Sequence, residues 1–218
     1  MALTPVIVIG AGGHAKVVIE LIREVGDYDV VSIVDADPRP RHMLGAAVVG
    51  DDSVLPRLRR EGIGHVFVAV GDNRRRVEIA RRVEAQGFRL INAISRRAAV
   101  SPSVQLGSGV AVMAGAVINA ETRIGDLVVV NTNAGVDHDC TLGEGAHIGP
   151  GSALAGRVDV GRLAFLGVGT RAIPGVSIGE NAVIGAGACV VCDIPPNVLA
   201  YGAPAKVIRR LDDWTDGR

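Results

Sequence analysis

The feature that most constrains the fold is a six-residue period that runs from residue 101 to residue 190. Read from Ser101, the chain gives fifteen successive hexads without an insertion, and the sixth residue is Leu, Val or Ile in all of them except the one that ends at Ala172. The fourth residue is always small or β-branched, and eight of the first residues are glycine. This pattern predicts a short strand followed by a tight turn in every hexad.

Three such hexads close a triangular coil, and successive coils stack by parallel β-sheet hydrogen bonding about 4.8 Å apart. Fifteen hexads therefore predict five coils, with the fourth and sixth residues pointing inward and the glycines at the turns. The pattern resembles that of the hexapeptide-repeat acyltransferases. This resemblance implies a left-handed parallel β-helix over residues 99–208 and association of the chains as trimers.

The first 98 residues predict a different kind of domain. The stretch "PVIVIGAGGHAKVVIELIREVG" indicates a buried strand, a glycine turn and a helix, and further strands and helices alternate after it. Strand–helix alternation predicts a parallel sheet, and hence a Rossmann-like α/β half domain at residues 1–98. Residues 209–218 are expected to form a C-terminal tail.

The glycine turn resembles a dinucleotide-binding motif, Gly10-x-Gly12-x-x-Ala15, and Asp35 follows the second strand, where a ribose-binding acid belongs. Glycines let the backbone approach a diphosphate, and the helix N-terminus supplies N–H groups and a positive dipole. A unit of this size is about half of a full dinucleotide fold, which favours a mononucleotide diphosphate over NAD. The alternative is a glycine turn that serves helix–strand packing alone.

Composition excludes several classes of function. The formal net charge is zero, so the charge balance does not indicate binding to nucleic acid or to a membrane surface. No apolar run approaches 18 residues and no leader-like segment precedes Val6, so we expect a cytoplasmic protein without membrane insertion. Three cysteines form no disulfide framework, and the pair Cys189 and Cys192 is a weak signal for a redox or zinc site without further ligands.

One stretch of the repeat, "VDHDC", breaks its plain composition. Asp137, His138 and Asp139 fall on the first three positions of a hexad, where a turn meets a strand. Acetyl transfer to an amine requires removal of a proton and stabilisation of an oxyanion. A histidine whose tautomer is fixed by a carboxylate serves the first need, so we predict His138 as general base and Asp139 as the residue that orients it. The alternative is a structural or solvated histidine.

The chain as a whole resembles a more specific family. The stretches "VIGAGGHAKVV", "VGDN", "NTNAGVDHDCTLGEGAHIGPG" and "GAPAK" are similar to those of the nucleotide-sugar N-acetyltransferases of the bacillosamine and perosamine pathways. These enzymes are relatives of the sialic-acid O-acetyltransferases. The resemblance implies an acetyl-CoA-dependent N-acetyltransferase that acts on the 4-amino group of a nucleotide-diphosphate-linked 4-amino-6-deoxy sugar. A GDP-perosamine-like sugar is favoured, with a role in O-antigen biosynthesis.

The resemblance also implies which residues bind the substrates. It places the base on His138 and its carboxylate on Asp139, between subunits of a homotrimer, with acetyl-CoA as cosubstrate and no metal. The acetyl-CoA contacts that it implies are His147, Gly156, Gly167, Val168, Ala186 and Lys206. The nucleotide-sugar contacts that it implies are Gly12, Gly13, His14, Asp35, Gly71, Asp72 and Asn73. Ala36 departs from the bacillosamine enzyme, which has a second aspartate there, so the choice between uracil and guanine stays open.

Three alternatives remain. O-acetylation of a sialic acid would use the same base on a hydroxyl. A metal-dependent hydratase would need three converging histidines, whereas the repeat region contains only His138 and His147. A non-catalytic nucleotide-binding scaffold trimer would have no use for the base–carboxylate pair. Outside these sites, Arg74–Arg76 are expected on a solvated helix face.

Overall fold

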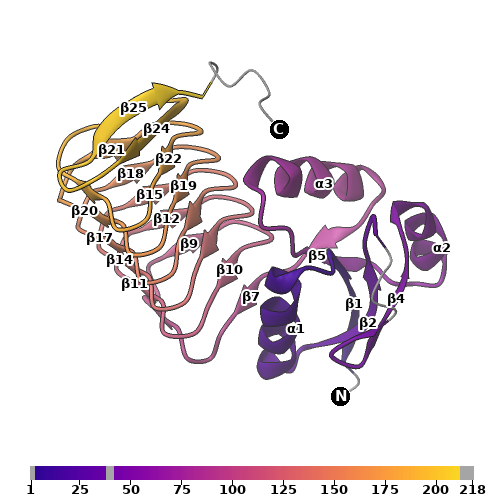
Figure 1. Cartoon of the computed structure of the whole chain (residues 1–218). Coiled ribbons are helices and arrows are strands. Elements are labelled where there is room, and N and C mark those ends of the chain that lie inside the picture. The colour runs from indigo at the N-terminus through magenta and orange to yellow at the C-terminus, as the bar shows by residue number, and fades with distance from the viewer. Residues whose placement is uncertain (1–2, 38–41, 212–218) are drawn as a thin grey trace. The chain divides into compact units, whose positions relative to one another are not determined.

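The computed structural model describes residues 3–37 and 42–211 (Figure 1). The chain divides into two compact units, Met1–Arg96 and Arg97–Arg218. Within the described residues, no helix has both the length and the apolar character needed to cross a membrane.

The first unit is an α/β domain built on one sheet, as the strand–helix alternation predicts. The strands follow the order β3-β4-β2-β1-β5-β6, and all neighbours are parallel except β3 and β4. The elements are β1 (Thr4–Ile9), α1 (Gly13–Val25), β2 (Tyr28–Val34), β3 (His42–Met43), β4 (Ala46–Gly50), the short 3₁₀ helix η1 (Asp52–Val54), α2 (Leu55–Arg60), β5 (His65–Val68), α3 (Asn73–Ala85), β6 (Arg89–Leu90) and β7 (Ala93–Ile94).

Helix α1 illustrates how the sequence sets these elements. Its buried residues recur at helical spacing and form one apolar face: Ala15, Val18, Ile19, Leu21 and Ile22. The helix ends at Gly26, which adopts a left-handed conformation with φ of 76° and donates its N–H to the carbonyl of Ile22. The Gly10 turn that precedes it is equally constrained, because φ is 112° and a Cβ atom would lie 2.7 Å from the Ala69 carbonyl oxygen.

The second unit is a parallel β-helix, which confirms the fold predicted from the hexads. Up to residue 190, strands of successive coils pair in a register of 18 residues, for example Val117 with Gly135 and Gly135 with Ala153. The coil therefore contains three hexads. The inward fourth and sixth residues are buried from the second hexad onward, including Ala172, the one exception in the sixth position.

Three sheets form the sides of this β-helix. Within the second unit, sheet I includes β10 (Ala111–Val112), β13 (Val129–Val130), β16 (His147–Ile148), β19 (Phe165–Leu166), β22 (Val183–Ile184), β24 (Val198–Tyr201) and the antiparallel β25 (Lys206–Arg210). Sheet II contains β8 (Ala99–Val100), β11 (Val117–Ile118), β14 (Gly135–Val136), β17 (Ala153–Leu154), β20 (Arg171–Ala172) and β23 (Cys189–Val190). Sheet III contains β9 (Gln105–Leu106), β12 (Arg123–Ile124), β15 (Thr141–Leu142), β18 (Asp159–Val160) and β21 (Ser177–Ile178).

The third residue of every hexad from the second to the fifteenth has positive φ, whether or not it is glycine. Asp139 is one of these residues, with φ of 59°. Glycines at the first position have a different use, since a Cβ atom at Gly167 would lie 2.7 Å from the backbone nitrogen of Ala186 in the next coil. Each turn therefore needs a residue with left-handed backbone conformation at the third position. Several turns also need a glycine at the first position, which permits close packing against the next coil.

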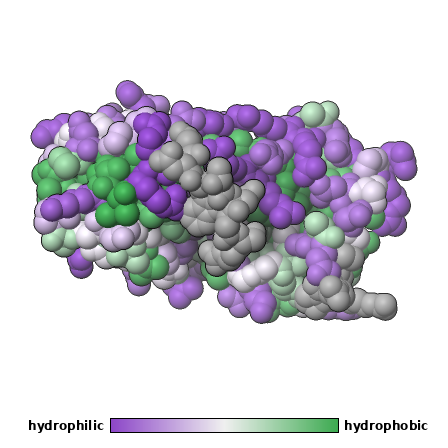
Figure 2. All heavy atoms as spheres, turned by 45° about the horizontal axis from the view of Figure 1, so that its top comes forward, coloured by the Kyte–Doolittle hydropathy of each residue, from purple (hydrophilic) through white to green (hydrophobic). Residues whose placement is uncertain are grey.

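Strand β25 includes Arg209 and Arg210, so the first two residues of the expected tail are in a strand; residues 212–218 lie outside the described residues. Figure 2 shows that hydrophobic side chains gather in patches on the surface. The exposed large apolar side chains of the β-helix unit are Val117, Phe165, Val168, Ile173, Val191, Tyr201, Val207 and Ile208.

Candidate active site

The first unit contains a cavity of about 420 Å³ at the carboxyl ends of its parallel strands. This edge is where open α/β sheets bind ligands. Five of the residues predicted to bind the nucleotide sugar line the cavity: Gly12, Gly13, His14, Asp35 and Gly71.

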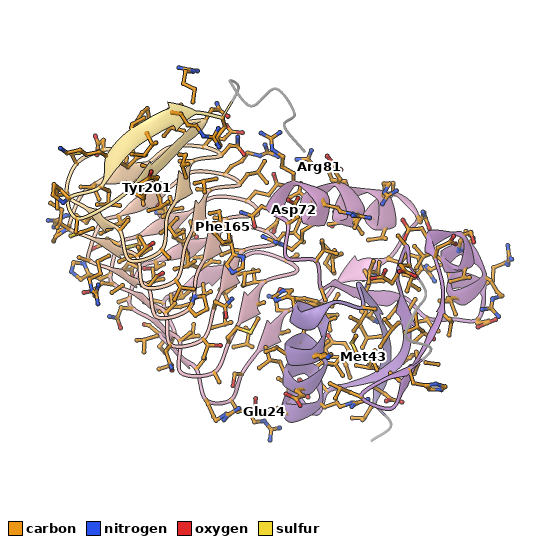
Figure 3. All side chains as sticks on the ribbon, in the orientation of Figure 1. Glu24, Met43, Asp72, Arg81, Phe165 and Tyr201 are labelled. Carbon is orange, nitrogen blue, oxygen red and sulfur yellow. The ribbon has the colours of Figure 1, made fainter. Side chains whose placement is uncertain are left out.

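The other two predicted residues support the cavity without lining it. Asp72 is the N-cap of α3, where its side chain accepts a hydrogen bond from the backbone nitrogen of Arg75 at 2.8 Å (Figure 3). Asn73 is buried, and its side-chain oxygen accepts a hydrogen bond from Arg76 Nη2 at 2.8 Å.

Asp35 fixes the glycine turn. Its Oδ2 accepts a hydrogen bond from the backbone nitrogen of Ala11 at 2.6 Å, and its Oδ1 accepts one from the backbone nitrogen of Asp37 at 2.8 Å. Each carboxylate oxygen has a second lone pair, so ribose hydroxyls can still donate to it.

Arg76 is buried at 1% exposure, in contrast to the solvated helix face expected for Arg74–Arg76. The expectation was wrong for Arg76 because its guanidinium donates to the carbonyls of Val70 and Gly71 in the cavity wall, at 2.9 and 3.3 Å. Burial lowers its pKa to about 10, and nearby Asp72 opposes the shift. Burial, and then the positive charge of Arg76, lowers the pKa of His14 to about 4, so His14 is neutral at pH 7.

Sequence reasoning missed a whole wall of this cavity. Arg75, Ile79 and Arg82 of α3 line it, together with Asp52 of η1. The spacing of the three α3 residues places them on one helix face, which was the signal available in the sequence. Arginine and apolar residues alternate along this helix, so the sequence does not indicate which arginines face a cavity.

In the β-helix unit, the structure brings His138 and Asp139 together. His138 Nδ1 lies 2.7 Å from Asp139 Oδ2, in the turn between β14 and β15. About half of each side chain is exposed, 51% for His138 and 53% for Asp139. Among the described residues, the hydrogen bonds of His138 use Nδ1 and its backbone atoms, which leaves Nε2 open to a substrate.

The turn that carries His138 is held by its neighbours. Asp137 Oδ1 accepts hydrogen bonds from Asn119 Nδ2 at 2.9 Å and from the backbone nitrogen of His138 at 2.8 Å. The Asn119 bond is the main cause that lowers the pKa of the Asp137 carboxyl below its usual range. Thr122 Oγ1 donates to the Asp137 carbonyl at 2.9 Å and ties the turn to the coil before it.

Gly156 lies one coil above His138 and leaves room for the imidazole because it has no side chain. A Cβ atom on Gly156 would lie 2.6 Å from both Cε1 and Nε2 of His138. Real side chains do not approach so closely, so any larger residue at 156 would displace the ring. The structure therefore places Gly156 beside the predicted base.

The remaining residues predicted to bind acetyl-CoA lie elsewhere on the β-helix. Gly167, Val168 and Ala186 are stacked in two successive turns between sheets I and II. His147 is in sheet I, where its ring makes an edge contact with Phe165 at a centroid distance of 5.2 Å. Phe165 and Tyr201 belong to this same sheet (Figure 3). Lys206 begins β25 and is exposed. One chain thus distributes these residues over two corners and one side, and their role stays a prediction.

The cysteines Cys140, Cys189 and Cys192 are free. The described part of the chain contains no group of three or more His, Cys, Asp or Glu side chains that could hold a metal ion.

Two family models match the chain. The model of the PglD N-terminal domain matches residues 5–83, and that of the bacterial transferase hexapeptide repeat matches residues 121–156. Among curated proteins, an uncharacterized protein of Acanthamoeba polyphaga mimivirus is 34% identical over 125 residues, which are 57% of this chain. The chain spans about a quarter of the length of that relative, since the match covers 24% of it.

Solved structures match over nearly the whole chain. PerB from Caulobacter crescentus, in complex with CoA and GDP-perosamine, is 57% identical with a TM-score of 0.92, and the match covers 95% of this chain and 99% of that one. The acetyltransferase domain of PglB from Neisseria gonorrhoeae, in complex with acetyl coenzyme A, is 41% identical with a TM-score of 0.88 and covers 95% and 100%. With both domains matched and this identity over almost its full length, the chain belongs to the family of hexapeptide-repeat nucleotide-sugar N-acetyltransferases.

Proposed function

We propose that this protein transfers the acetyl group of acetyl-CoA to the 4-amino group of a GDP-linked 4-amino-6-deoxy sugar of the perosamine type. The observation that carries the proposal is the His138–Asp139 pair beside Gly156, in a chain that is 57% identical to a protein solved with CoA and GDP-perosamine. The presence of both an α/β cavity and a β-helix histidine–carboxylate pair in the chain supports the same conclusion.

The reaction forms one amide bond and breaks one thioester bond. The sugar amine attacks the thioester carbonyl, and His138 Nε2 accepts the proton that the amine loses. The same proton then passes to the leaving sulfur, so CoA leaves as the thiol. Asp139 accepts a hydrogen bond from Nδ1–H, which fixes the tautomer that leaves Nε2 unprotonated. Backbone N–H groups of the glycine-rich turns are suitable donors to the oxyanion.

The cavity of the first unit is suited to the nucleotide diphosphate. Gly12, Gly13 and His14 form the entry to α1, where N–H groups and the helix dipole favour an anion. Arg75 adds positive charge to the lining. A neutral His14 can donate one hydrogen bond to a phosphate oxygen without the cost of a second buried cation.

We further propose a homotrimer in which acetyl-CoA binds between subunits. Two features support it: the exposed apolar side chains of the β-helix unit, and the distribution of the predicted CoA residues over separate corners of one chain. A cytoplasmic location and a role in O-antigen biosynthesis stay predictions.

The test measures release of the CoA thiol from acetyl-CoA by the purified protein. The acceptors are GDP-perosamine, a UDP-linked 4-amino-6-deoxy sugar and free sialic acid. Release with GDP-perosamine supports the proposal, and mass spectrometry then shows the N-acetyl product. Release with sialic acid alone would indicate O-acetylation, and no release with any acceptor would favour the non-catalytic scaffold.

A further inference from the structure

We infer that Asp52, held by Arg82, recognises the base of the nucleotide and selects guanine. This inference rests on the proposed function, because it assumes that the cavity of the first unit binds a nucleoside diphosphate. It assigns a role to two residues that neither the glycine motif nor the family resemblance indicated.

The direction in which a nucleotide lies follows from the order of the strands. The cavity residues come from the ends of β5, β1, β2 and β4, which are neighbours in the sheet in this order. Gly12–His14 lie at the end of β1, where α1 begins, and are suited to the diphosphate. Asp35 follows β2 and is suited to the ribose. The base then extends to the end of β4, two strand spacings or about 10 Å from β1, where Asp52 lies.

Two successive aspartates follow β4, but only one of them faces the cavity. Asp51 is the N-cap of η1, and its Oδ1 accepts hydrogen bonds from both the backbone nitrogen and the hydroxyl of Ser53 at 3.0 and 2.6 Å. Asp52 lines the cavity instead. Its Oδ2 lies 3.0 Å from Arg82 Nη2, and 42% of its side chain is exposed.

The ion pair fixes the position of the carboxylate. Arg82 reaches it from α3 and lines the cavity as well. An exposed ion pair of this kind contributes little to stability. It gains value when a bound base covers it and excludes water, since charge-assisted hydrogen bonds are stronger in such surroundings.

A carboxylate selects among bases by what it can accept. It has acceptor atoms and no donor, so it fits a base edge with two adjacent donors. Guanine presents N1–H and the N2 amino group side by side. Uracil presents one N–H between two carbonyl oxygens, which the carboxylate would repel, and adenine presents one amino group beside an acceptor nitrogen. Ile79, a buried apolar residue of the same wall, offers a surface for the face of the ring.

The test measures binding of GDP and IDP to the full-length protein by calorimetry, without sugar or acetyl-CoA. IDP differs from GDP by the absence of the 2-amino group, so the ratio of the two affinities reports one contact. We expect the wild type to bind GDP at least about 10-fold more tightly than IDP, which is the size of effect expected for a bidentate contact to a base. Asp52→Asn replaces one oxygen by an amino group, which should weaken GDP binding by a similar factor and bring the ratio close to one.

Matched variants separate recognition from structure. Asp51→Asn changes the adjacent aspartate and keeps a good N-cap, so its GDP-to-IDP ratio should equal that of the wild type. Arg82→Gln removes the residue that positions Asp52 and should lower the ratio without abolishing diphosphate binding. Asp51 is exposed and Asp52 is half-buried, so circular dichroism should show that every variant is folded.

The outcomes distinguish the inference from the proposed function. An unchanged ratio in Asp52→Asn, or equal binding of GDP and IDP by the wild type, overturns the role of Asp52 while GDP binding itself still supports the nucleotide site. Failure of the wild type to bind any of GDP, IDP and UDP overturns both. A collapsed ratio in Asp52→Asn with a normal ratio in Asp51→Asn establishes Asp52 as the residue that selects the base.

Discussion

Two corners of the β-helix use the same backbone turn in different ways. At the corner between sheets III and I, Arg162 lies between Glu144 and Glu180, with Nε and Nη1 each 3.0 Å from a glutamate oxygen. These residues are 18 positions apart, so each pair joins successive coils. At the corner between sheets II and III, His138 instead pairs with Asp139 in its own turn, and the residue above it is Gly156.

The difference illustrates how one turn of a repeat can be used for a candidate site. Along the stack, Arg162 forms ion pairs with both glutamates, so these side chains join the coils. A pair within one turn, with a glycine in the next coil, leaves one face of the imidazole accessible. The β-helix supplies the geometry at both corners, and a few side chains determine whether it is used for support or for chemistry.

Replacing His138 should break this contrast most strongly. We expect His138→Ala to lower kcat at pH 7 by about 100-fold or more, the usual contribution of a general base. The loss should shrink as the pH rises, because the sugar amine then loses its proton without help. Thiol release from acetyl-CoA measured from pH 6 to pH 10 tests this. His42→Gln, a change at an exposed position in the other unit, is the control. Equal rates of His138→Ala and wild type across this range would contradict the role of the base.

Gly156→Ala tests whether the open space above His138 matters. The added Cβ would displace the ring, and a misplacement of about 1 Å can cost up to about 100-fold in rate. We expect kcat to fall by about 10-fold or more, with little change in the KM of the nucleotide sugar. Gly135→Ala adds the same methyl group where nothing lies within 4 Å, and should be close to wild type. Equal rates of both variants would show that the ring does not need this space.

Most of the fold was predictable because the hexads repeat. The fourth and sixth residues point inward in nearly every hexad, so many weak signals agree on one architecture. The α/β unit was predictable from strand–helix alternation. The left-handed turn residues were not, since Glu121, Leu127 and Arg157 adopt positive φ without any glycine to mark it.

The candidate site was predictable in part. His138 and Asp139 are adjacent in sequence, so their contact followed from local reasoning. The cavity wall formed by Arg75, Ile79 and Arg82 depends on which face α3 presents, and the pair with Asp52 joins residues 30 positions apart. The position of Gly156 beside the imidazole follows from the 18-residue register, but the size of the space there depends on the rotamer of His138.

Asp137 should have a smaller effect than Gly156, because it supports the turn without facing Nε2. Asp137→Ala removes the acceptor of Asn119 and of the His138 backbone nitrogen, and we expect kcat to fall a few-fold. The lowered pKa of Asp137 also predicts that the free energy of unfolding depends on pH. The stabilising contribution of this carboxylate is fully present above its unfolded pKa, near 4, and is lost as the pH falls further. Chemical denaturation between pH 3 and pH 7 should therefore show a smaller loss of stability toward low pH in Asp137→Ala than in the wild type. An equal loss in both proteins would contradict this.

The smallest effect should come from the corner that only supports the fold. Arg162 is about one third exposed and each of its glutamate partners is partly open to solvent, so the ladder should contribute about 1 kcal/mol or less to the free energy of unfolding. Arg162→Ala leaves Glu144 and Glu180 as like charges on one edge, and added salt should recover part of the lost stability by screening them. Its transfer rate should equal that of the wild type under every condition that slows His138→Ala. A large loss of activity in Arg162→Ala would show that this corner, too, belongs to the site, and the contrast between the two corners would then fail.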